Sequence, residues 1–315
     1  MDRLPETSEL APSQSDGTTV HIGYRQPYRY DLLLDFLAFR AIAGVEVVRD
    51  GVYSRSVSLP LALAQLDAAS PLGADSGNAK VGWIQVRDLP ERNCLALTLS
   101  AGLSSLLPLV NAKVKWLFDT DCEPDVIRKG LAAFYQRVPA SCRLEGIRLP
   151  GSFDGFEMAV RAILGQQITV KAANTLAGRL AARFGETIPT PIEGLSLIFP
   201  QASAFCAEGA AECLGELGVI RSRARAICAL AQAVTEGGLE LRPGVDVEAT
   251  CRALCALPGI GEWTARYIAM RALGHPDAFL TTDYAVKKAF KDLGGKELER
   301  LSEDWRPWRS YAVMS

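Results

Sequence analysis

The stretch Leu257-Pro-Gly-Ile-Gly-Glu-Trp-Thr-Ala265 decides the fold of this chain. Residues 247–256 before it have helical spacing, and Asp246 is a suitable N-cap for that helix. A second helix is expected from about residue 263 to residue 273, where Gly274 would end it. The pattern therefore predicts two helices joined by a tight, glycine-rich hairpin.

This hairpin is suited to binding phosphate. We expect Gly259 and Gly261 to adopt backbone conformations that other residues avoid, and the missing Cβ atoms let a phosphate approach the main chain. The N–H groups at the start of the second helix can then donate to it. From this stretch alone, a simple turn between two helices with glycine punctuation is an equally valid interpretation.

An acidic residue, Asp283, follows the hairpin. Asp283 lies eighteen residues beyond Ala265, after the extended apolar segment that begins at Phe279 and before another amphipathic helix. A helix N-terminus keeps a carboxylate ionised, and an ionised carboxylate stabilises a developing oxocarbenium ion. The alternative is that Asp283 or Thr282 only caps the helix.

Composition limits the classes of partner. The 315 residues suffice for two or three domains, and 49% are hydrophobic. The net charge of −2 argues against a broadly basic nucleic-acid surface, so any DNA site must use a local basic face, backbone amides and helix N-termini. No apolar run would span a bilayer and no secretory signal begins the chain, so we expect a cytoplasmic protein with no membrane partner.

The pattern along the chain predicts an α+β protein with a mixed N-terminal module followed by two all-α subdomains. Residues 1–22 are expected to form a disordered tail and residues 23–104 the mixed domain. We expect residues 105–128 and 274–315 to form the helical subdomain that carries Asp283. Residues 129–273 would form the subdomain with the helix-hairpin-helix motif.

The hairpin and Asp283 together resemble the helix-hairpin-helix DNA glycosylase superfamily, and more closely its alkylated-base branch, the 3-methyladenine DNA glycosylase II family. Several separated blocks in one order are more specific than any single block. They are Gln26-Pro27-Tyr28, the helix with Phe36, Leu149-Pro150-Gly151 with Phe156, residues 161–168 and Trp305-Arg-Pro-Trp-Arg-Ser-Tyr311.

The resemblance implies a damaged nucleotide flipped from double-stranded DNA into a cleft between domains, with Asp283 as the catalytic aspartate. It implies a monomer near the nucleoid that needs no cofactor, except that the hairpin can hold a structural monovalent cation, Na⁺ or K⁺. The backbone carbonyls implied to bind that cation belong to Cys255, Leu257 and Ile260. The backbone amides implied to meet the DNA phosphate lie around Gly259, Gly261 and Thr264.

The base pocket should be aromatic. Alkylation at N3 or N7 makes a purine cationic, and electron-rich rings attract a cation. Trp263 and Tyr267 are spaced to share one helix face, and Phe36 aligns with a pocket aromatic of the family. Ordinary core packing is the alternative for all three. The family's last helix usually runs on past Tyr311 with another pocket aromatic, so either the reading frame is truncated or the pocket is more open here.

Two further positions bear on the reaction. Trp263 stands where glycosylases that also nick the strand carry a nucleophilic lysine, and no cysteine follows Cys255 to bind the iron–sulfur cluster of the endonuclease III branch. Gln167 occupies the position of the wedge that fills the gap left by the flipped base, unless it is a loop residue that faces solvent.

The sequence therefore predicts a monofunctional glycosylase that hydrolyses the N-glycosidic bond of 3-methyladenine-like or 7-methylguanine-like bases in base excision repair. Two alternatives stay open. One is a non-catalytic helix-hairpin-helix DNA-binding module. The other is a glycosylase for oxidised or deaminated bases, which the charge preference of the pocket would distinguish.

Overall fold

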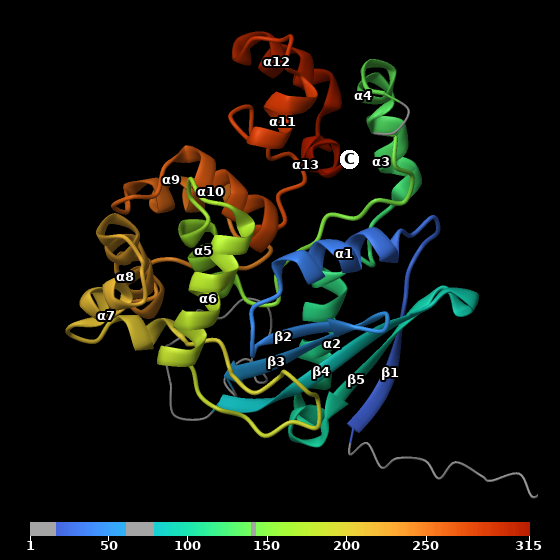
Figure 1. Ribbon diagram of the computed structural model, residues 1–315. Coiled ribbons are helices and arrows are strands. Elements are labelled where there is room, and N and C mark those ends of the chain that lie inside the picture. The colour runs from blue at the N-terminus through green and yellow to red at the C-terminus, as the bar shows by residue number, and fades with distance from the viewer. Residues whose placement is uncertain (1–16, 61–78, 140–142) are drawn as a thin grey trace, which may run out of the picture.

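The computed structural model describes residues 17–60, 79–139 and 143–315, and its N-terminal part is built on one antiparallel sheet (Figure 1). The strand order is β1-β5-β4-β3-β2. The strands are β1 Gly17–Gly23, β2 Glu46–Arg49, β3 Val52–Pro60, β4 Ala79–Leu89 and β5 Cys94–Ser100. The remainder is helical, so the predicted α+β class is confirmed.

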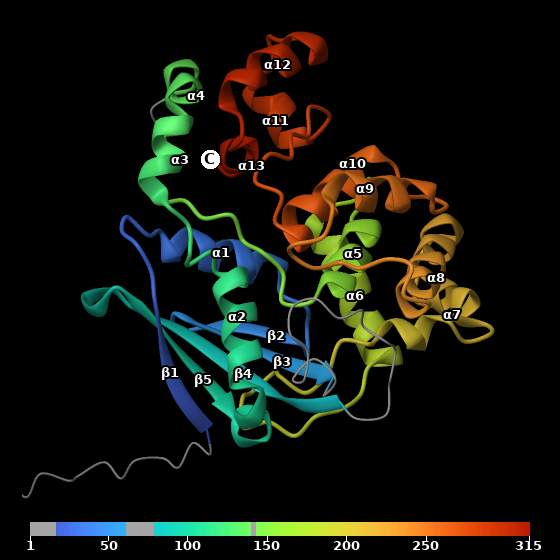
Figure 2. The same cartoon turned by 180° about the vertical axis from the view of Figure 1, so that it is seen from behind.

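The sheet is half-buried, as its alternating sequence requires. In β5, Leu95, Leu97 and Leu99 are fully buried while their neighbours point to the other face. Two helices, α1 Tyr30–Arg40 and α2 Leu107–Leu117, pack on this domain, and α2 crosses one face of the sheet (Figure 2).

The predicted disordered tail is wrong for residues 17–22, while residues 1–16 lie outside the described part. Strand β1 pairs with β5 from Gly17 opposite Ser100 to Gly23 opposite Cys94. The segment holds β-branched residues, and Ile22 is buried among the core of the sheet. The polar composition of the residues before position 17 therefore led to the wrong prediction for this edge strand.

The helical part begins after α2. Its helices are α3 Pro124–Gly130, α4 Ala132–Arg137, α5 Gly155–Leu164, α6 Val170–Phe184, α7 Ala210–Glu216, α8 Arg221–Thr235, α9 Val247–Ala256, α10 Glu262–Ile268, α11 Tyr284–Ala289, α12 Gly295–Ser302 and α13 Arg309–Met314. A π-helical segment, Ala269–Leu273, continues α10. Short 3₁₀ turns cover Pro90–Arg92, Ala101–Leu106, Ala202–Phe205 and Glu303–Trp305.

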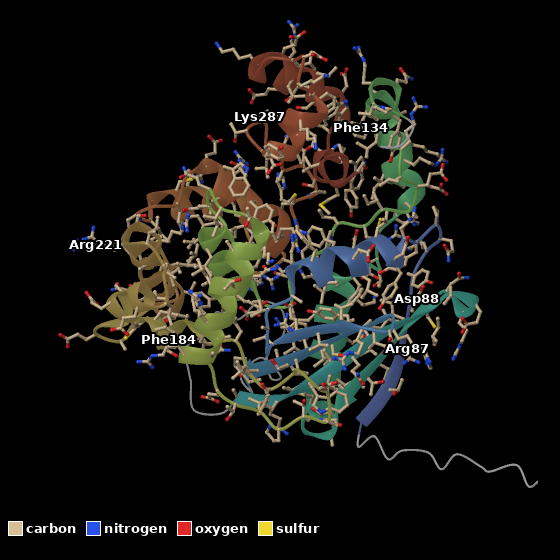
Figure 3. All side chains as sticks on the ribbon, viewed as in Figure 1. Arg87, Asp88, Phe134, Phe184, Arg221 and Lys287 are labelled. Carbon is tan, nitrogen blue, oxygen red and sulfur yellow. The ribbon has the colours of Figure 1, made fainter. Side chains whose placement is uncertain are left out.

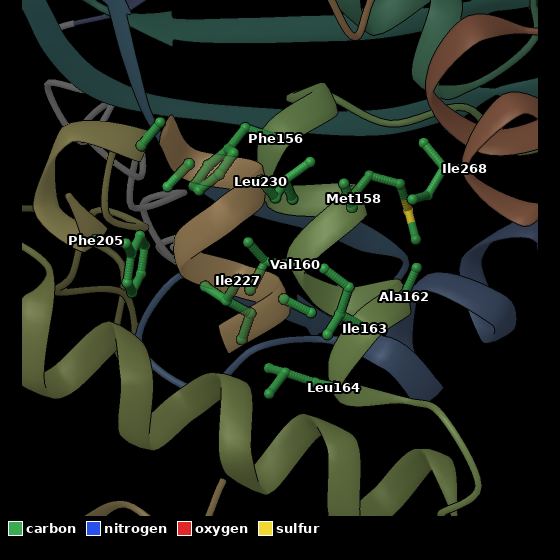
Figure 4. Close-up of a cluster of buried hydrophobic side chains, with 14 of the residues drawn as sticks. Phe156, Met158, Val160, Ala162, Ile163, Leu164, Phe205, Ile227, Leu230 and Ile268 are labelled. Carbon is green, nitrogen blue, oxygen red and sulfur yellow. The ribbon is translucent and has the colours of Figure 1, made fainter. Parts of the chain in front are cut away.

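Two helical cores result. One surrounds the apolar α5, with Val160 and Ile163 fully buried against α8 (Figure 4). In the other, α3 and α4 lie beside α11–α13 although far apart in sequence (Figures 1 and 2). There Phe134 meets Trp305 edge-on, with ring centroids 5.1 Å apart.

The cores divide the chain differently from the expected boundaries at two places. Helix α2 was expected with the catalytic subdomain, but its Val110 and Val114 pack into the core of the sheet. Residues 129–149 were expected with the hairpin, but Leu131 and Phe134 pack against the C-terminal helices. Burial of each helix's apolar face set the boundary, and helical spacing alone does not show which partner covers that face.

None of the helices in the described ranges is both long and apolar enough to cross a membrane.

Candidate active site

A cleft of about 1120 Å³ lies where the mixed domain and the two helical groups meet. Its walls come from α1, α5, the loop after α5, the hairpin, α10 and the segment before α11. Of the predicted site residues, the structure brings to this cleft Phe36, Gln167, Gly259, Trp263, Thr264, Tyr267 and Asp283. Gly261 and the three predicted carbonyl ligands do not line it.

Asp283 both caps a helix and lines the cleft. It is the N-cap of α11, and its Oδ1 accepts from the backbone N–H of Ala285 at 2.8 Å. The side chain is half-buried, with Thr282 and Tyr284 beside it in the same wall. Asp283 therefore does cap the helix, as the alternative interpretation holds. Capping does not prevent its side chain from lining the cleft.

Trp263 and Tyr267 form a stacked pair on α10. Their ring centroids are 5.3 Å apart and the rings are within 4° of parallel. Both side chains are half-buried rather than lost in a core, and both line the cleft. The i, i+4 spacing thus builds a flat aromatic wall in the same cleft as Asp283.

Phe36 also lines the cleft, but its ring is already engaged by two arginines. The guanidinium carbon of Arg40 lies 3.7 Å from the ring centroid and that of Arg271 lies 4.7 Å from it. Cation–π attraction between Phe36 and the protein's own guanidinium groups competes with a cationic base. Phe36 therefore orders these arginines as well as the cleft wall.

Arg271 is held in place by neutral groups. It is buried in the π-helical segment, and its Nε and Nη2 donate to the carbonyl oxygens of Pro150 and Gly151 at 2.5 and 3.2 Å. Its Nη1 donates to the Tyr267 hydroxyl at 3.1 Å.

These charges affect the pKa values in the wall. Burial lowers the pKa of the Arg40 and Arg271 guanidinium groups. Burial alone would raise the pKa of the Tyr267 hydroxyl, but the positive charges of Arg271, Arg40 and Arg161 outweigh burial and lower it. The aromatic wall therefore faces a field of positive charge.

Below these groups lies a buried set of ion pairs. Arg55 Nη2 contacts Glu157 Oε2 at 2.6 Å, and Arg161 Nη1 contacts Glu46 Oε2 at 2.9 Å and Glu157 Oε1 at 3.1 Å. Burial tends to raise the pKa of Glu46, but Arg161 and Arg55 outweigh that effect and lower it. The negative charges of the two carboxylates balance the positive charges of the two guanidinium groups. These ion pairs join β2 and β3 to α5.

The hairpin confirms one glycine prediction and corrects another. Gly259 has a φ of +78°, the left-handed region that favours glycine. Gly261 instead has an ordinary extended backbone, with φ −92° and ψ 174°. A Cβ added at Gly261 would meet nothing within 4 Å. The backbone conformation therefore requires glycine at position 259 only. At position 261 the structure shows open space beside the main chain.

The start of α10 presents free amide groups. The first backbone N–H of this helix with a backbone acceptor is that of Ala265, which donates to Gly261 at 3.0 Å. The amides of residues 262–264 precede it, as at any helix N-terminus. The Thr264 side chain is buried, so only its backbone suits the predicted phosphate role.

The donor set of the hairpin fits a monovalent cation. In the described chain, no backbone hydrogen bond of the loop ends on the carbonyl oxygens of Cys255 or Ile260, and Leu257 accepts only a long one from Ile260 at 3.3 Å. Carbonyl oxygens are the ligands that hard cations prefer. The chemistry of these carbonyl oxygens therefore suits such an ion.

The loop after α5 carries Gln167 as predicted, between the end of α5 at Leu164 and the start of α6 at Val170. Gly165 is the C-cap of α5, with an ordinary φ of −75°. The left-handed residue is Gln167 itself, with φ +55° and an exposed side chain. Such a conformation is uncommon for a residue with a Cβ and is often found at functional sites.

Sequence reasoning missed three arginines of the cleft. Each lies four residues from another cleft residue on the same helix: Arg40 after Phe36, Arg161 after Glu157 and Arg271 after Tyr267. An arginine within the apolar helix α5 was the available signal, because a charge there must find a buried partner.

Comparisons with known proteins identify the family of this chain. Residues 19–154 match the AlkA N-terminal domain, and residues 160–304 match the HhH-GPD superfamily of base excision DNA repair proteins. The chain belongs to that superfamily.

Two relatives match nearly the whole chain. It is 35% identical over 293 residues to DNA-3-methyladenine glycosylase 2 of Escherichia coli strain K12, covering 93% of this chain and 94% of that protein. It is 34% identical over 309 residues to a probable bifunctional transcriptional activator/DNA repair enzyme AlkA of Mycobacterium tuberculosis, covering 97% of this chain. The chain spans 58% of the length of that second relative.

Solved structures share the fold. The 3-methyladenine DNA-glycosylase of Archaeoglobus fulgidus matches 94% of this chain and 97% of its own, with a TM-score of 0.73 at 19% identity. An 8-oxoguanine glycosylase/lyase of Clostridium acetobutylicum, in complex with double-stranded DNA, covers 87% of this chain and 96% of its own with a TM-score of 0.59 at 14% identity. One fold thus serves two kinds of base, so the fold alone does not choose between them.

Proposed function

We propose that this protein is a monofunctional DNA glycosylase that releases alkylated purines from duplex DNA. The observation that carries the proposal is the meeting of Asp283 with the stacked Trp263 and Tyr267 in one cleft. The relatives named for 3-methyladenine support this substrate class. The proposed place of action is the bacterial nucleoid, where that DNA lies.

The chemistry begins with a flipped base against the aromatic wall. An N3- or N7-alkylated purine is cationic, so breaking its N-glycosidic bond sends the bonding electron pair to the base and releases it as a neutral molecule. The flat pair of Trp263 and Tyr267 can stack on that base. Such a leaving group needs little help from a general acid.

Asp283 serves the sugar that remains. As the bond breaks, positive charge develops on the anomeric carbon and the ring oxygen. A carboxylate fixed by the Ala285 N–H at 2.8 Å needs no rearrangement to stabilise that charge. A water molecule then adds to the anomeric carbon and loses a proton, which leaves an abasic site.

Grip on the duplex comes from the hairpin and nearby cations. The free amides at the start of α10 can donate to a DNA phosphate, and a monovalent ion on the carbonyls of Cys255, Leu257 and Ile260 would fix the loop. Arg221 and Lys287 extend from the surface at α8 and α11 (Figure 3). Gln167 would fill the gap in the base stack.

The reaction should stop at the abasic site. Trp263 has no amine, and no lysine is found among the residues that line the described cleft. A strand-nicking glycosylase needs such an amine to form a covalent adduct with the sugar. Borohydride added during the reaction should therefore trap no covalent protein–DNA complex.

The test is base release from methylated duplex DNA. Asp283→Asn should lower the single-turnover rate by at least about a hundredfold, because the charge opposite the sugar is lost. Asparagine is also a good N-cap, so the helix is retained. DNA affinity should persist or rise.

Asp246→Asn is the matched control. Asp246 caps α9 through the Ala249 N–H at 3.0 Å and lies outside the cleft. If both variants keep near wild-type rates, Asp283 is only a cap and another group stabilises the sugar. If the wild-type protein releases no base, the non-catalytic binding alternative is favoured. If the wild type instead releases oxidised or deaminated bases alone, the alkylated substrate class is wrong.

A further inference from the structure

Gln166 joins the loop after α5 to the hairpin. We call residues 165–169 the wedge loop. The Gln166 Nε2 donates to the Gly259 carbonyl at 2.9 Å and lies 3.0 Å from the Thr264 hydroxyl. Gly259 belongs to the turn and Thr264 to the first turn of α10, so one amide bridges both halves of the hairpin.

A second contact holds the same residue from the other side. The Arg223 side chain is buried, and its Nη2 donates to the backbone carbonyl of Gln166. In the described chain Arg223 forms no ion pair. The hairpin also packs on this part of α8, since a Cβ at Gly259 would lie 3.3 Å from Ala226 Cβ and 3.4 Å from the Ser222 carbonyl. The wedge loop, the hairpin and α8 thus converge on Gln166.

Gln167, the next residue, needs such support. Its left-handed backbone is strained for a residue with a Cβ, and its side chain is exposed, so its own contacts do not hold it there. The backbone bonds inside the loop are long: Gln166 N to Ile163 O is 3.3 Å and Ile168 N to Gly165 O is 3.5 Å. The Gln166 contacts are the firm ones.

We propose that Gln166 is a positioning residue that couples phosphate binding by the hairpin to insertion of Gln167 into the duplex. This inference rests on the proposed function. A phosphate held at the start of α10 fixes the DNA backbone relative to the hairpin, and Gln166 fixes the wedge loop relative to the same hairpin. Gln167 then meets the base stack at one set depth.

The variant Gln166→Met tests the coupling, because methionine keeps the length of the side chain and lacks both N–H donors. With two neutral hydrogen bonds lost, single-turnover base release from a methylated duplex should slow about tenfold. Release from the same bases in single-stranded DNA, which has no stack to fill, should change less than about twofold. Gln232→Met is the control, since within the described residues its Nε2 donates only to the exposed Glu236 Oε1 at 2.8 Å.

A double-mutant cycle separates positioning from general damage. In a Gln167→Ala background, Gln166→Met should cause no further loss on duplex DNA, because the residue that it positions is gone. Independent, additive losses would overturn the proposal. Equal losses on duplex and single-stranded DNA would overturn it as well, since they indicate a role in folding or in the hairpin alone.

Binding gives a readout that does not depend on base release. Gln166→Met should reduce the preference for a duplex with an abasic-site analogue over an undamaged duplex by about tenfold. Affinity for undamaged DNA should not change. Loss of that preference in a protein that releases no alkylated base would refute the proposed function and keep the coupling. An unchanged preference in an active enzyme would refute the coupling only.

Discussion

Two sets of arginines line the same cleft in opposite circumstances. Arg55 and Arg161 are paired with Glu46 and Glu157 at 2.6 to 3.1 Å. The ion pairs of the described cleft include neither Arg40 nor Arg271, which contact an aromatic ring, carbonyl oxygens and a hydroxyl instead. The paired set is neutral and ties the sheet to α5, whereas no ion pair of the described cleft neutralises the charge of the second set.

This difference bears on the choice of base. The unpaired guanidinium groups repel a cationic purine and favour a base that leaves as an anion. The aromatic wall acts in the other direction, because a ring face attracts a cation. Substrate preference therefore depends on which influence is larger at the base.

The paired set should matter most for stability. Glu157→Gln removes a buried charge that serves both Arg55 and Arg161, so it should lower the free energy of unfolding by about 3 kcal/mol. Denaturant unfolding measures it. Glu193→Gln, which breaks an exposed pair with Arg49, is the control and should lower the free energy of unfolding far less. If both variants lowered the free energy of unfolding by a similar amount, the buried ion pairs would have no special role in stability.

The unpaired set should matter for substrate preference. Arg40→Gln should raise the single-turnover release of 7-methylguanine relative to hypoxanthine about tenfold, because one positive charge leaves the cleft. The ratio of the two rates on matched duplexes is the measurement. Arg29→Gln, on an exposed arginine paired with Asp31, should leave that ratio unchanged. A constant ratio in Arg40→Gln would show that its charge does not reach the base.

Asp119 extends the contrast to a carboxylate without an ion pair. Burial raises its pKa to about 6, although the Leu149 N–H and the Tyr311 hydroxyl oppose that effect. Its folded pKa lies above its unfolded value, so its stabilising contribution is full below about pH 4 and is lost as the pH rises through about 6.

Asp119→Asn should therefore raise the free energy of unfolding above pH 6 by about 1 kcal/mol. Asparagine tolerates the φ of +49° at this position. Unfolding at pH 5 and pH 7.5 measures the change. An equal pH dependence in wild type and variant would show that pairing is not what separates Asp119 from Glu46.

The sequence predicted those parts of the molecule that depend on local pattern. Helix α9 runs from Val247 to Ala256 with Asp246 as its cap, as expected, because capping and apolar spacing are local signals. Trp263 and Tyr267 stack because i, i+4 residues share a helix face.

Features that depend on distant partners were not predicted. Arg40 and Arg271 come together around Phe36 from helices more than two hundred residues apart, and no local pattern reports such a contact. The left-handed Gln167 was missed for a related reason: tertiary contacts through Gln166 and Arg223 hold a conformation that glycine propensity would assign to Gly165.

The π-helical segment Ala269–Leu273 sets the rotational phase of everything that follows it. An α-helix turns by about 100° and rises about 1.5 Å for each residue, and a π turn accommodates one residue more than an α turn. Deleting Ala272 would let this stretch return to α-helical winding. The angle at which Arg271 meets Pro150 would then change, and the segment that leads to Asp283 would leave from a different side of the helix axis. The length of this helix, in addition to the residues on it, determines which side of the cleft carries the carboxylate.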